Sequence, residues 1–556
     1  MKKWEIVNKF KVEDIVKVLL ENRGLKTKKD IELFLNPPDP STLTSKDVGI
    51  DKASLTRAVR RIQKAVKDKE SIVVYADYDA DGITAGAIMW ETLHSLGASV
   101  MPYIPHRVEE GYGLSVKGID AVRQEYDPTL IITVDHGITA WEKVLYAKKL
   151  GIDVIVTDHH VKPKKLPDCT IVHTTKLSGA GVSWFLAKEI VSKFRTNEAA
   201  KPDDYIALAA IGTIADMVPL VGSNRSIVKY GLSLINSTKR VGLEALMADA
   251  GLTKGALDVY AVSHALAPRL NAVGRLEHAM DALRLLCTKQ SDKAALLAEK
   301  LGLTNRDRQK LTEETILHAR ENLKGKAVRK LVFVAHESYN PGVIGLVAGK
   351  LMEEYYLPAI VVSKGNEFSK ASARSISGFN IVEAIRTCSD ILVDVGGHPM
   401  AAGFTVETKN LVVLQERLEK IAENELTEDK LTRTLKIDAE IPLDLVTPEI
   451  YTFLQQLQPF GFGNPEPVFI SRGVLVTEAR LVGANGKHLK LRVMPSNNVA
   501  IKQFNNCLFD AIAFNFGSLY GKLQNNSTVD LAYTIDMNTW NGSSKLQLKV
   551  KDIHLV

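Results

Sequence analysis

Three short apolar runs, each ending at or just before an aspartate, place the strongest constraint on the fold of this chain. They are SIVVYA (71–76), TLIITV (129–134) and DVIVTD (153–158). Short runs that are apolar throughout and rich in Val and Ile are typical of parallel strands buried on both faces. The segments between them are long enough for crossover helices. The sequence therefore predicts a doubly wound α/β domain over residues 51–224.

The rest of the chain divides into four segments with different patterns. Residues 1–50 contain FLNPPDPSTLT, whose prolines exclude a long helix, and we interpret them as an N-terminal arm. Residues 225–325 have helical patterns and predict a helical connector that ends in a long charged helix. A second α/β domain is predicted over 326–428, beginning at KLVFVAH (330–336) and continuing through LPAIVVS (357–363). Short alternating runs separated by Gly and Asn turns predict a small antiparallel β-barrel over 429–556.

Composition excludes several classes of protein. With 45% hydrophobic and 24% charged residues, the chain has the composition of an ordinary soluble protein. No segment approaches the roughly 18 uninterrupted apolar residues of a membrane span. Charges recur through the first 20 residues, where a signal peptide would be apolar, so we expect a cytoplasmic protein. The four cysteines lie far apart without CxxC spacing, which favours neither a zinc site nor disulfides.

The charge distribution is compatible with a polyanionic partner. The net charge of +6 is by itself weak evidence for one. The charge is concentrated, however, because residues 481–552 contain eight Lys or Arg and four acidic residues. This segment is therefore a candidate for contacting phosphates.

Four clusters of acidic and histidine residues lie in the first predicted domain. They are Asp77-Tyr78-Asp79-Ala80-Asp81-Gly82, Asp135-His136-Gly137, Asp158-His159-His160, and the single carboxylate of Ile211-Gly212-Thr213-Ile214-Ala215-Asp216-Met217. The first three follow predicted strands at their carboxyl ends, where doubly wound sheets bind their ligands. Any one cluster could equally be a helix cap or a turn. Together they predict a metal-binding site.

The residue types indicate which metal and which chemistry. Carboxylates with one or two imidazoles suit manganese or magnesium. Two such ions close together can activate a water and stabilise both oxygens of a phosphoryl displacement. The chain has no GxxxxGK[ST] loop, which argues against nucleoside triphosphate hydrolysis of the P-loop type.

The order of these clusters, DxDxDG, DHG, DHH and then GTIADMVPL, resembles the DHH phosphoesterase superfamily. The resemblance implies that Asp79, Asp81, Asp135, His159 and Asp216 are metal ligands. It places Asp77 and His160 beside them as catalytic residues, with His160 touching the scissile phosphate. For His136, a catalytic role and a structural role in a turn both stay open.

Motifs further along the chain are similar to the RecJ exonucleases within that superfamily. They are PRLNAVGRL (268–276), PGVIG (341–345), ARSI (373–376), GGHPMAAG (396–403) and PFGFGNPEP (459–467). The resemblance implies a DHH-associated second domain, and substrate binding by Arg269, Asn271, Arg275, Arg374, Ser375, Gly396, Gly397 and His398. An arginine can bind a phosphate bidentately, and a Gly-Gly turn permits close approach of backbone N–H groups. A glycine turn with a structural histidine remains the alternative for the Gly396–His398 segment.

The resemblance also implies that the C-terminal barrel is of the oligonucleotide-binding type. Its basic residues Lys487, Lys490, Arg492 and Lys502 could follow a nucleic-acid backbone, and aromatic residues could stack bases. The aromatic candidates are Phe504, Phe509, Phe514, Phe516 and Trp540, most of which we expect in the core.

Two features depart from the resemblance. Val172-His173-Thr174 stands where relatives commonly have an Asn-Pro pair, which leaves that loop uncertain. The chain also ends at about the end of the barrel, so we do not expect the additional C-terminal domain of some relatives.

The implied activity is a 5′-to-3′ exonuclease that is specific for single-stranded DNA and releases 5′-mononucleotides by two-metal-ion hydrolysis, in DNA repair and recombination. Implied cofactors are two manganese or magnesium ions. Implied partners are single-stranded DNA and a helicase or single-strand-binding protein, and we expect a monomer. Two alternatives stay open: a DHH phosphodiesterase of short oligonucleotides or cyclic dinucleotides, and a catalytically inactive DNA-binding scaffold of the replication machinery.

Overall fold

The computed structural model describes residues 2–8, 14–107, 109–194, 202–325, 329–496, 508–523, 526–540 and 542–556. The chain forms two compact units. The larger unit comprises Pro38–Val218 and Ser223–Leu431, and the smaller comprises Met1–Pro37, Pro219–Gly222 and Thr432–Val556.

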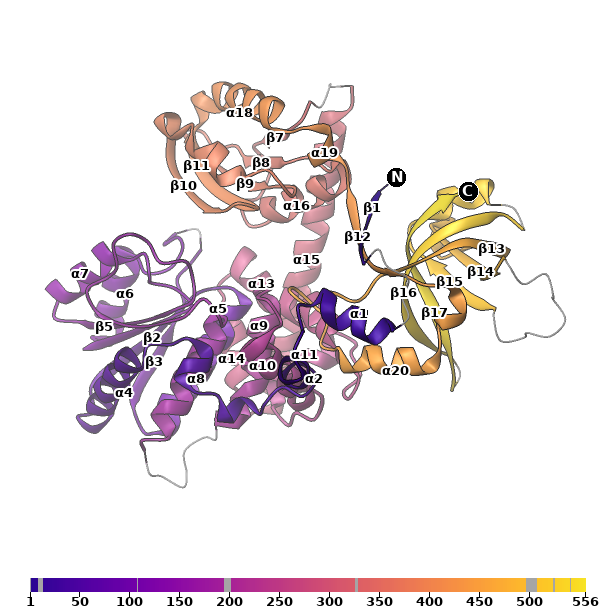
Figure 1. The fold of residues 1–556 in the computed structure, drawn as a ribbon. Coiled ribbons are helices and arrows are strands. Elements are labelled where there is room, and N and C mark those ends of the chain that lie inside the picture. The colour runs from indigo at the N-terminus through magenta and orange to yellow at the C-terminus, as the bar shows by residue number, and fades with distance from the viewer. Residues whose placement is uncertain are drawn as a thin grey trace. The chain divides into compact units, whose positions relative to one another are not determined.

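The first domain of the larger unit is built on a five-stranded sheet in the order β3-β2-β4-β5-β6 (Figure 1). Its strands are β2 (Ser71–Ala76), β3 (Ser99–Tyr103), β4 (Leu130–Val134), β5 (Asp153–Asp158) and β6 (Thr170–His173). All neighbouring strands are parallel. The three apolar runs of the sequence are β2, β4 and β5, so the predicted doubly wound domain is confirmed.

Helices cover both faces of this sheet (Figure 1). Helices α6 (Val116–Tyr126) and α7 (Trp141–Lys149) pack on the face that carries Val73, Ile131 and Val154. The other face is covered by α4 (Lys52–Lys67), α5 (Ala80–Ser95) and α8 (Gly179–Val191), and the short α3 (Ser45–Val48) precedes α4. Burial on both faces explains why these strands are apolar at every position.

The predicted connector is helical, and its described residues contain no strand. After α9 (Ile206–Ala215), its helices are α10 (Gly222–Asn236), α11 (Val241–Asp249), α12 (Val259–Ala261), α13 (Ala267–Leu276), α14 (Met280–Cys287) and α15 (Ser291–Leu323). The predicted long charged helix is α15. This helix is not exposed on all sides, because Ala294, Ala298 and Leu301 are buried along one side of it.

The second domain of the larger unit has a mixed sheet in the order β10-β11-β9-β8-β7. Its strands are β7 (Val332–His336), β8 (Ala359–Ser363), β9 (Phe368–Arg374), β10 (Leu392–His398) and β11 (Ala401–Glu407). Only the β7–β8 pair is parallel. Its helices are α16 (Ile344–Tyr355), α17 (Ile381–Arg386), α18 (Leu411–Glu425) and α19 (Glu428–Leu431).

The smaller unit contains a closed five-stranded barrel. Its strands are β13 (Phe469–Val482), β14 (His488–Pro495), β15 (Phe509–Ala513), β16 (Thr528–Trp540) and β17 (Ser543–Leu555). Strand β13 pairs with both β14 and β16 and thereby closes the barrel. The β15–β17 pair is parallel, while the other barrel pairs are antiparallel. The predicted fold class, two α/β domains with a helical connector and a C-terminal barrel, is confirmed.

The N-terminal residues also belong to the smaller unit. Strand β1 (Lys3–Asn8) runs parallel to β12 (Thr434–Glu440) in a register that pairs Lys3 with Thr434. Helices α1 (Ile15–Asn22), α2 (Lys28–Leu35) and α20 (Pro448–Gln456) contribute to the core that fills the barrel. No helix among the described residues is long and apolar enough to cross a membrane.

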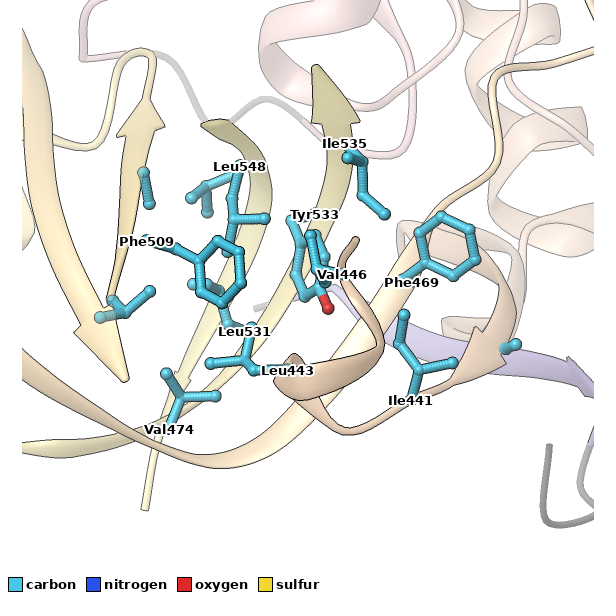
Figure 2. Packing of buried hydrophobic residues seen from close by; sticks show 14 of the residues in the cluster. Ile441, Leu443, Val446, Phe469, Val474, Phe509, Leu531, Tyr533, Ile535 and Leu548 are labelled. Atoms are coloured by element: carbon cyan, nitrogen blue, oxygen red, sulfur yellow. The ribbon is translucent and has the colours of Figure 1, made fainter. Parts of the chain in front are cut away.

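We expect Leu531→Ala to destabilise the smaller unit by about 2–5 kcal/mol, because the truncation leaves a cavity in a closely packed core. Leu531 is fully buried among Leu443, Val474 and Phe509 (Figure 2). The control is Leu481→Ala, which truncates a leucine that is 44% exposed and should cost less than about 0.5 kcal/mol. Urea unfolding of both variants measures the difference. Equal losses of stability would contradict the assigned core.

Candidate active site

The strand register brings three aspartates to one edge of the parallel sheet. Ala76 pairs with Val134, and Val134 pairs with Thr157. The residues that come next in the chain, Asp77, Asp135 and Asp158, therefore occupy adjacent positions at the carboxyl ends of β2, β4 and β5. All three side chains are almost fully buried.

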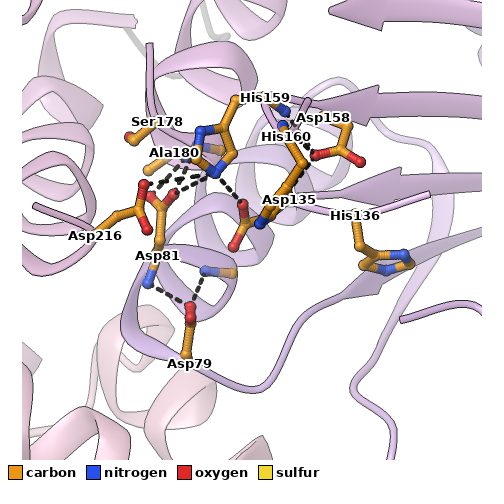
Figure 3. A network of polar contacts seen from close by, with 12 residues as sticks. Asp79, Asp81, Asp135, His136, Asp158, His159, His160, Ser178, Ala180 and Asp216 are labelled. Atoms are coloured by element: carbon orange, nitrogen blue, oxygen red, sulfur yellow. Dashed lines mark hydrogen bonds and ion pairs between the residues drawn. The ribbon is translucent and has the colours of Figure 1, made fainter. Parts of the chain in front are cut away.

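Backbone N–H groups at two helix N-termini hold two further carboxylates (Figure 3). Asp79 caps α5 by accepting hydrogen bonds from the N–H groups of Asp81 and Gly82, both at 3.0 Å. Asp81 accepts hydrogen bonds from the N–H groups of Gly179 at 2.6 Å and Ala180 at 2.9 Å, where α8 begins. Such N–H groups stabilise negative charge.

The imidazole of His159 faces three carboxylates (Figure 3). Its Nε2 lies 3.2 Å from Asp135 Oδ1, 3.5 Å from Asp216 Oδ2 and 3.9 Å from Asp81 Oδ2. Asp216 reaches this position because it directly follows the last residue of α9. Helix α9 thus supplies the fourth predicted carboxylate to the cluster formed by the strand ends.

The protonation equilibria reflect crowding of negative charge. Burial, together with Asp79, raises the pKa of Asp81 to about 7. Burial, together with Asp81 and Asp79, raises the pKa of Asp216 to about 8. Burial and neighbouring carboxylates also raise the pKa of Asp77 and Asp135 well above the ordinary value. Burial and His160 lower the pKa of His159 to about 4, so its imidazole is neutral.

The residues present fit bound cations. Buried Asp77 Oδ1, Asp135 Oδ1 and His159 Nε2 have no hydrogen-bond partner. Within each of three groups the ligand atoms lie within 4.8 Å of one another: Asp77, Asp79 and Asp135; Asp81, His159 and Asp216; Asp135, His159 and His160. Asp135 and His159 each belong to two groups, so the groups form one continuous donor set. Oxygen donors with imidazole suit manganese or magnesium, and a cation would remove the repulsion between the carboxylates.

His160 is held by Asp158 rather than by the carboxylate cluster. Its Nδ1 lies 2.7 Å from Asp158 Oδ1, while Asp158 Oδ2 accepts a hydrogen bond from the N–H of Ile138 at 2.8 Å. Burial favours the neutral imidazole, but the bond to Asp158 outweighs it and raises the pKa of His160 to about 9. His160 therefore carries a positive charge at neutral pH. Its Nε2 lies 3.4 Å from the hydroxyl of Tyr112.

His136 lies apart from the cluster (Figure 3). Its Nε2 is 3.0 Å from the carbonyl oxygen of Tyr75, and its side chain is 1% exposed. Burial lowers the pKa of His136 to about 4. The structure therefore does not bring this sequence candidate together with the predicted metal ligands.

Two glycines leave the room that the carboxylates occupy. A Cβ at Gly179 would lie 2.3 Å from Asp135 Oδ1, and a Cβ at Gly212 would lie 2.4 Å from Asp81 Oδ1. Any side chain at either position would have to displace a carboxylate. Gly212 of the GTIAD segment is thus explained by close approach to Asp81.

The PRLNAVGR segment forms α13, which contacts the acidic loop. Asn271 Oδ1 accepts a hydrogen bond from the N–H of Ala80 at 2.8 Å, and thus holds the start of α5. Arg269 forms an ion pair with Asp249 at 2.8 Å and is occupied in packing α13 against α11. The two sequence candidates therefore occupy different surroundings.

Arg107, Arg308 and Arg374 lie within electrostatic range of Arg275. Burial, with Arg107, Arg308 and Arg374, lowers the pKa of Arg275 to about 10. Arg275 donates to the carbonyl of Gly342 at 3.3 Å, and Arg374 donates to the carbonyl of Ala373 at 2.8 Å. In the described parts of the chain, none of the four has a carboxylate within ion-pairing distance. Such a cluster is a strong site for an anion.

This arginine cluster adjoins the carboxylates. Arg107 is in electrostatic range of Asp77, and Arg275 of Asp79. The guanidinium of Arg107 also lies 4.9 Å from the ring centre of Tyr78. A phosphodiester with one phosphate at the metal ligands therefore has cationic groups beside it.

Some of the substrate-binding candidates on and near β9 and β10 have a structural role. The Ser375 hydroxyl is buried and donates to the carbonyl of Phe379 at 2.7 Å. Gly397 has φ +139°, and a Cβ there would lie 2.3 Å from the carbonyl oxygen of Ala401. Gly396 and His398 are exposed, and His398 is in electrostatic range of His159.

The basic candidates of the barrel lie on and beside β14. Lys487 is exposed and Lys490 is half-buried, whereas Arg492 lies 3.4 Å from both Glu478 and Asp510. Among the aromatic candidates, Phe509 is in the core and Phe516 packs against it, while Phe514 is 51% exposed. Lys502, Phe504 and the side chain of Trp540 lie outside the described residues.

Sequence reasoning missed Tyr112, Arg107 and Arg308. The first two lie in the loop before α6, and Arg308 lies in the middle of α15. None belongs to a recognisable motif, and their convergence in the fold is what identifies them. A signal was nevertheless present, because HRVEEGYG combines charge, an aromatic residue and glycines in one loop.

Comparison with known proteins agrees with this geometry. Family models match residues 71–213 (DHH family, N-terminal domain), 327–424 (DHHA1 domain) and 437–552 (RecJ OB domain). The single-stranded-DNA-specific exonuclease RecJ of Bacillus subtilis is 36% identical over 98% of this chain and 69% of its own length. The Escherichia coli protein of the same name is 30% identical over 97% of this chain and 95% of its own length.

Solved structures are also similar. The crystal structure of RecJ with Mn²⁺ from Thermus thermophilus matches with a TM-score of 0.83 at 30% identity, covering 99% of this chain and 79% of that chain. A RecJ exonuclease structure bound to manganese, at 35% identity, has a TM-score of 0.59 over 66% of this chain and 94% of that chain. On its sequence, its domains and the carboxylate cluster at its sheet edge, this chain belongs to the RecJ family of the DHH superfamily.

Proposed function

We propose that this protein is a metal-dependent exonuclease that hydrolyses single-stranded DNA from its 5′ end and releases 5′-mononucleotides, in DNA repair and recombination. The observation that carries the proposal is the buried carboxylate and imidazole donor set, whose ligand atoms lie within 4.8 Å of one another in each group. Relatives at 30–36% identity are named single-stranded-DNA-specific exonucleases, which supports the substrate.

Six residues would hold two divalent cations, manganese or magnesium: Asp77, Asp79, Asp81, Asp135, His159 and Asp216. Cations held there would supply a means of activating a water molecule and of stabilising charge on the phosphoryl oxygens. The protein's own contribution is to shield these ligand atoms from solvent and to hold them in position. Gly179 and Ala180 orient Asp81, and Asn271 holds the helix start that carries Asp79 and Asp81.

His160 supplies a proton donor beside the donor set. Its bond to Asp158 keeps the imidazolium charged and directs Nδ1 away from the substrate. Its Nε2–H is then available to a non-bridging phosphate oxygen. We assign His136 a structural role, because its Nε2 lies 3.0 Å from the carbonyl of Tyr75.

The arginine cluster supplies phosphate binding. Arg275 and Arg374 are partly buried and lack carboxylate partners in the described residues. A bound phosphate would therefore replace the contacts with water that these arginines lose on burial. Arg107 and Arg308 extend the same site. We assign to it the terminal phosphate of the strand, which gives the enzyme a means of recognising an end. His398 and the exposed Gly396 are a second candidate contact for the strand.

The barrel provides a separate contact for DNA further along the strand. Lys487 and Lys490 can follow the phosphates, and exposed Phe514 can stack a base. Arg492 is a weaker candidate, because Glu478 and Asp510 already lie near it. Contacts of this kind depend on salt and tolerate any sequence.

The arrangement of domains and partners completes the proposal. We propose an arm (1–50), a DHH domain (51–224), a connector (225–325), a DHH-associated domain (326–428) and a barrel (429–556). Family models match within three of these segments, the DHH domain, the DHH-associated domain and the barrel. An enzyme for single strands needs another activity to expose them, so we propose a helicase or a single-strand-binding protein as partner. We further propose that it works as a cytoplasmic monomer, as the family resemblance implies.

Single-stranded DNA labelled at the 5′ or the 3′ end should release mononucleotides from the 5′ end only, with manganese or magnesium and not with chelator. Matched RNA and duplex DNA are the controls. Cleavage confined to two- to five-residue oligonucleotides would instead indicate a short-substrate phosphodiesterase. Binding without any cleavage would indicate a scaffold.

Asp135→Asn should abolish cleavage and yet stabilise the metal-free protein by about 1–3 kcal/mol at pH 8, because it removes a buried charge that four other aspartates repel. Asparagine tolerates the φ of +68° at this position. Manganese should raise the melting temperature of the wild type more than that of the variant, which keeps the donor group of Asp81, His159 and Asp216. Asp168→Asn, at a side chain that is 98% exposed, is the control and should behave like wild type. A manganese response in Asp135→Asn as large as that of the wild type would contradict the assignment of Asp135 as a ligand.

Arg374→Gln should lower kcat/KM for 5′-phosphorylated strands by about 30-fold, which corresponds to the roughly 2 kcal/mol for loss of a buried charged contact. Strands with a 5′-hydroxyl should be affected much less, because they lack the phosphate that the arginine binds. Arg386→Gln, at an exposed arginine paired with Glu383, is the matched control. An equal loss on both kinds of end would refute the assignment of the terminal phosphate to this site.

A further inference from the structure

Met217, which follows Asp216 at the end of α9, has an unusual backbone and an unusual exposure. Its φ is +57°, in the left-handed region, and its side chain is 66% exposed. Its N–H donates to the carbonyl of Ile214 at 3.3 Å, and the N–H of Asp216 donates to that of Gly212 at 2.9 Å. Met217 therefore stands at the first position beyond the helix, where glycine is the usual residue.

Methionine is an unfavourable residue for the backbone conformation at this position. A left-handed conformation is unfavourable for a residue with a Cβ, and such strain is normally offset by burial or by a polar contact of the side chain. Met217 is exposed, and a thioether is at most a weak hydrogen-bond acceptor. In the described part of the chain it is the one residue that combines a positive φ with a large exposed hydrophobic side chain. Backbone strain at a functional site that no structural contact offsets indicates that Met217 has a role in function.

The position of Met217 in the chain ties it to the metal-binding cluster. Asp216 Oδ2 lies 3.5 Å from His159 Nε2. Two other residues near the cluster in sequence or in space have exposed hydrophobic side chains: Val161, which is 70% exposed and follows His160, and Tyr112, which is 54% exposed. The hydroxyl of Tyr112 lies 3.4 Å from His160 Nε2. Exposed apolar side chains thus belong to residues that directly follow Asp216 and His160 in the chain, and to Tyr112, which contacts His160.

We propose that Met217 is a substrate-positioning residue that packs against the sugar and base of the terminal nucleotide while its phosphodiester is at the metal-binding cluster. The inference rests on the proposed function. Carboxylates, histidines and arginines recognise phosphates, and the apolar surface of the nucleotide needs a different contact. Methionine is flexible and polarisable, and its sulfur makes favourable contacts with aromatic rings of any kind. It therefore contacts all four bases without selecting among them, as a sequence-tolerant exonuclease requires.

The test compares two 5′-phosphorylated strands that differ only in their terminal nucleotide, which is either normal or abasic. Release of the first nucleotide is measured for the wild type and for Met217→Ala. The wild type should prefer the normal strand by about tenfold in kcat/KM, from apolar contact with the base. Met217→Ala should lose about tenfold on the normal strand and little on the abasic one. Met217→Leu, which keeps an apolar side chain, should restore most of the preference.

Two controls separate positioning from stability. Met217→Gly relieves the backbone strain, so its melting temperature should rise while its preference for the normal strand is lost. Leu296→Ala truncates a side chain that is 69% exposed on α15 and should change neither quantity.

The outcomes are distinct. Equal losses by Met217→Ala on both strands, or no loss on either, overturn the assignment of Met217 and leave the proposed function standing. If the wild type releases no nucleotide from the normal strand, the proposed function fails and this inference fails with it.

Discussion

Repulsion between buried carboxylates is the physical constraint on which the active-site half of the structure depends. Asp77, Asp81 and Asp135 are each about 2% exposed, and burial with mutual repulsion raises the pKa of all three. The fold tolerates this because N–H groups of α5 and α8 point at the carboxylates, and because glycines leave room for them. The atoms that remain unsatisfied, including Asp77 Oδ1, Asp135 Oδ1 and His159 Nε2, are those that a cation would contact.

A second concentration of like charge lies beside the first. Arg275 and Arg374 lose solvation without gaining carboxylates among the described residues, and burial, together with Arg107, Arg308 and Arg374, lowers the pKa of Arg275 to about 10. Separate acidic and basic clusters cost stability in the free protein. They are complementary to a substrate whose phosphates bind cations on one side and arginines on the other. Met217, which follows Asp216, has a strained backbone that also lowers stability, and we propose that its side chain binds substrate in return.

The smaller unit, in contrast, is stabilised mainly by apolar packing. Its stability comes from an ordinary apolar core (Figure 2), and β13 closes the barrel by pairing on both edges. Lys487 and Phe514 are exposed and lie outside that core. Binding by the barrel and chemistry at the sheet edge are therefore separable in physical terms. Substitutions in one are expected to leave the other largely intact.

The sequence alone determined the sheet and the order of the acidic clusters. The β-branched runs before Asp77 and Asp135 are typical of parallel strands buried on both faces, and parallel strands bring the residues at their carboxyl ends to one edge of the sheet. It also indicated the helical connector and the barrel from their local periodicity. These features are local, so the pattern of neighbouring residues is enough to reveal them.

Tertiary structure alone decided which of the similar residues share a site. His136 and His160 both lie close after an Asp, yet one contacts the carbonyl of Tyr75 and the other Asp158. Strand β1 pairs with β12 across more than 400 residues of chain, and Arg107, Arg275, Arg308 and Arg374 converge from four separate segments. Contacts between distant segments depend on the packing of whole domains, and no local pattern encodes them. The residue types that carry the chemistry can therefore be predicted from the sequence, whereas the contacts of each side chain depend on the tertiary structure.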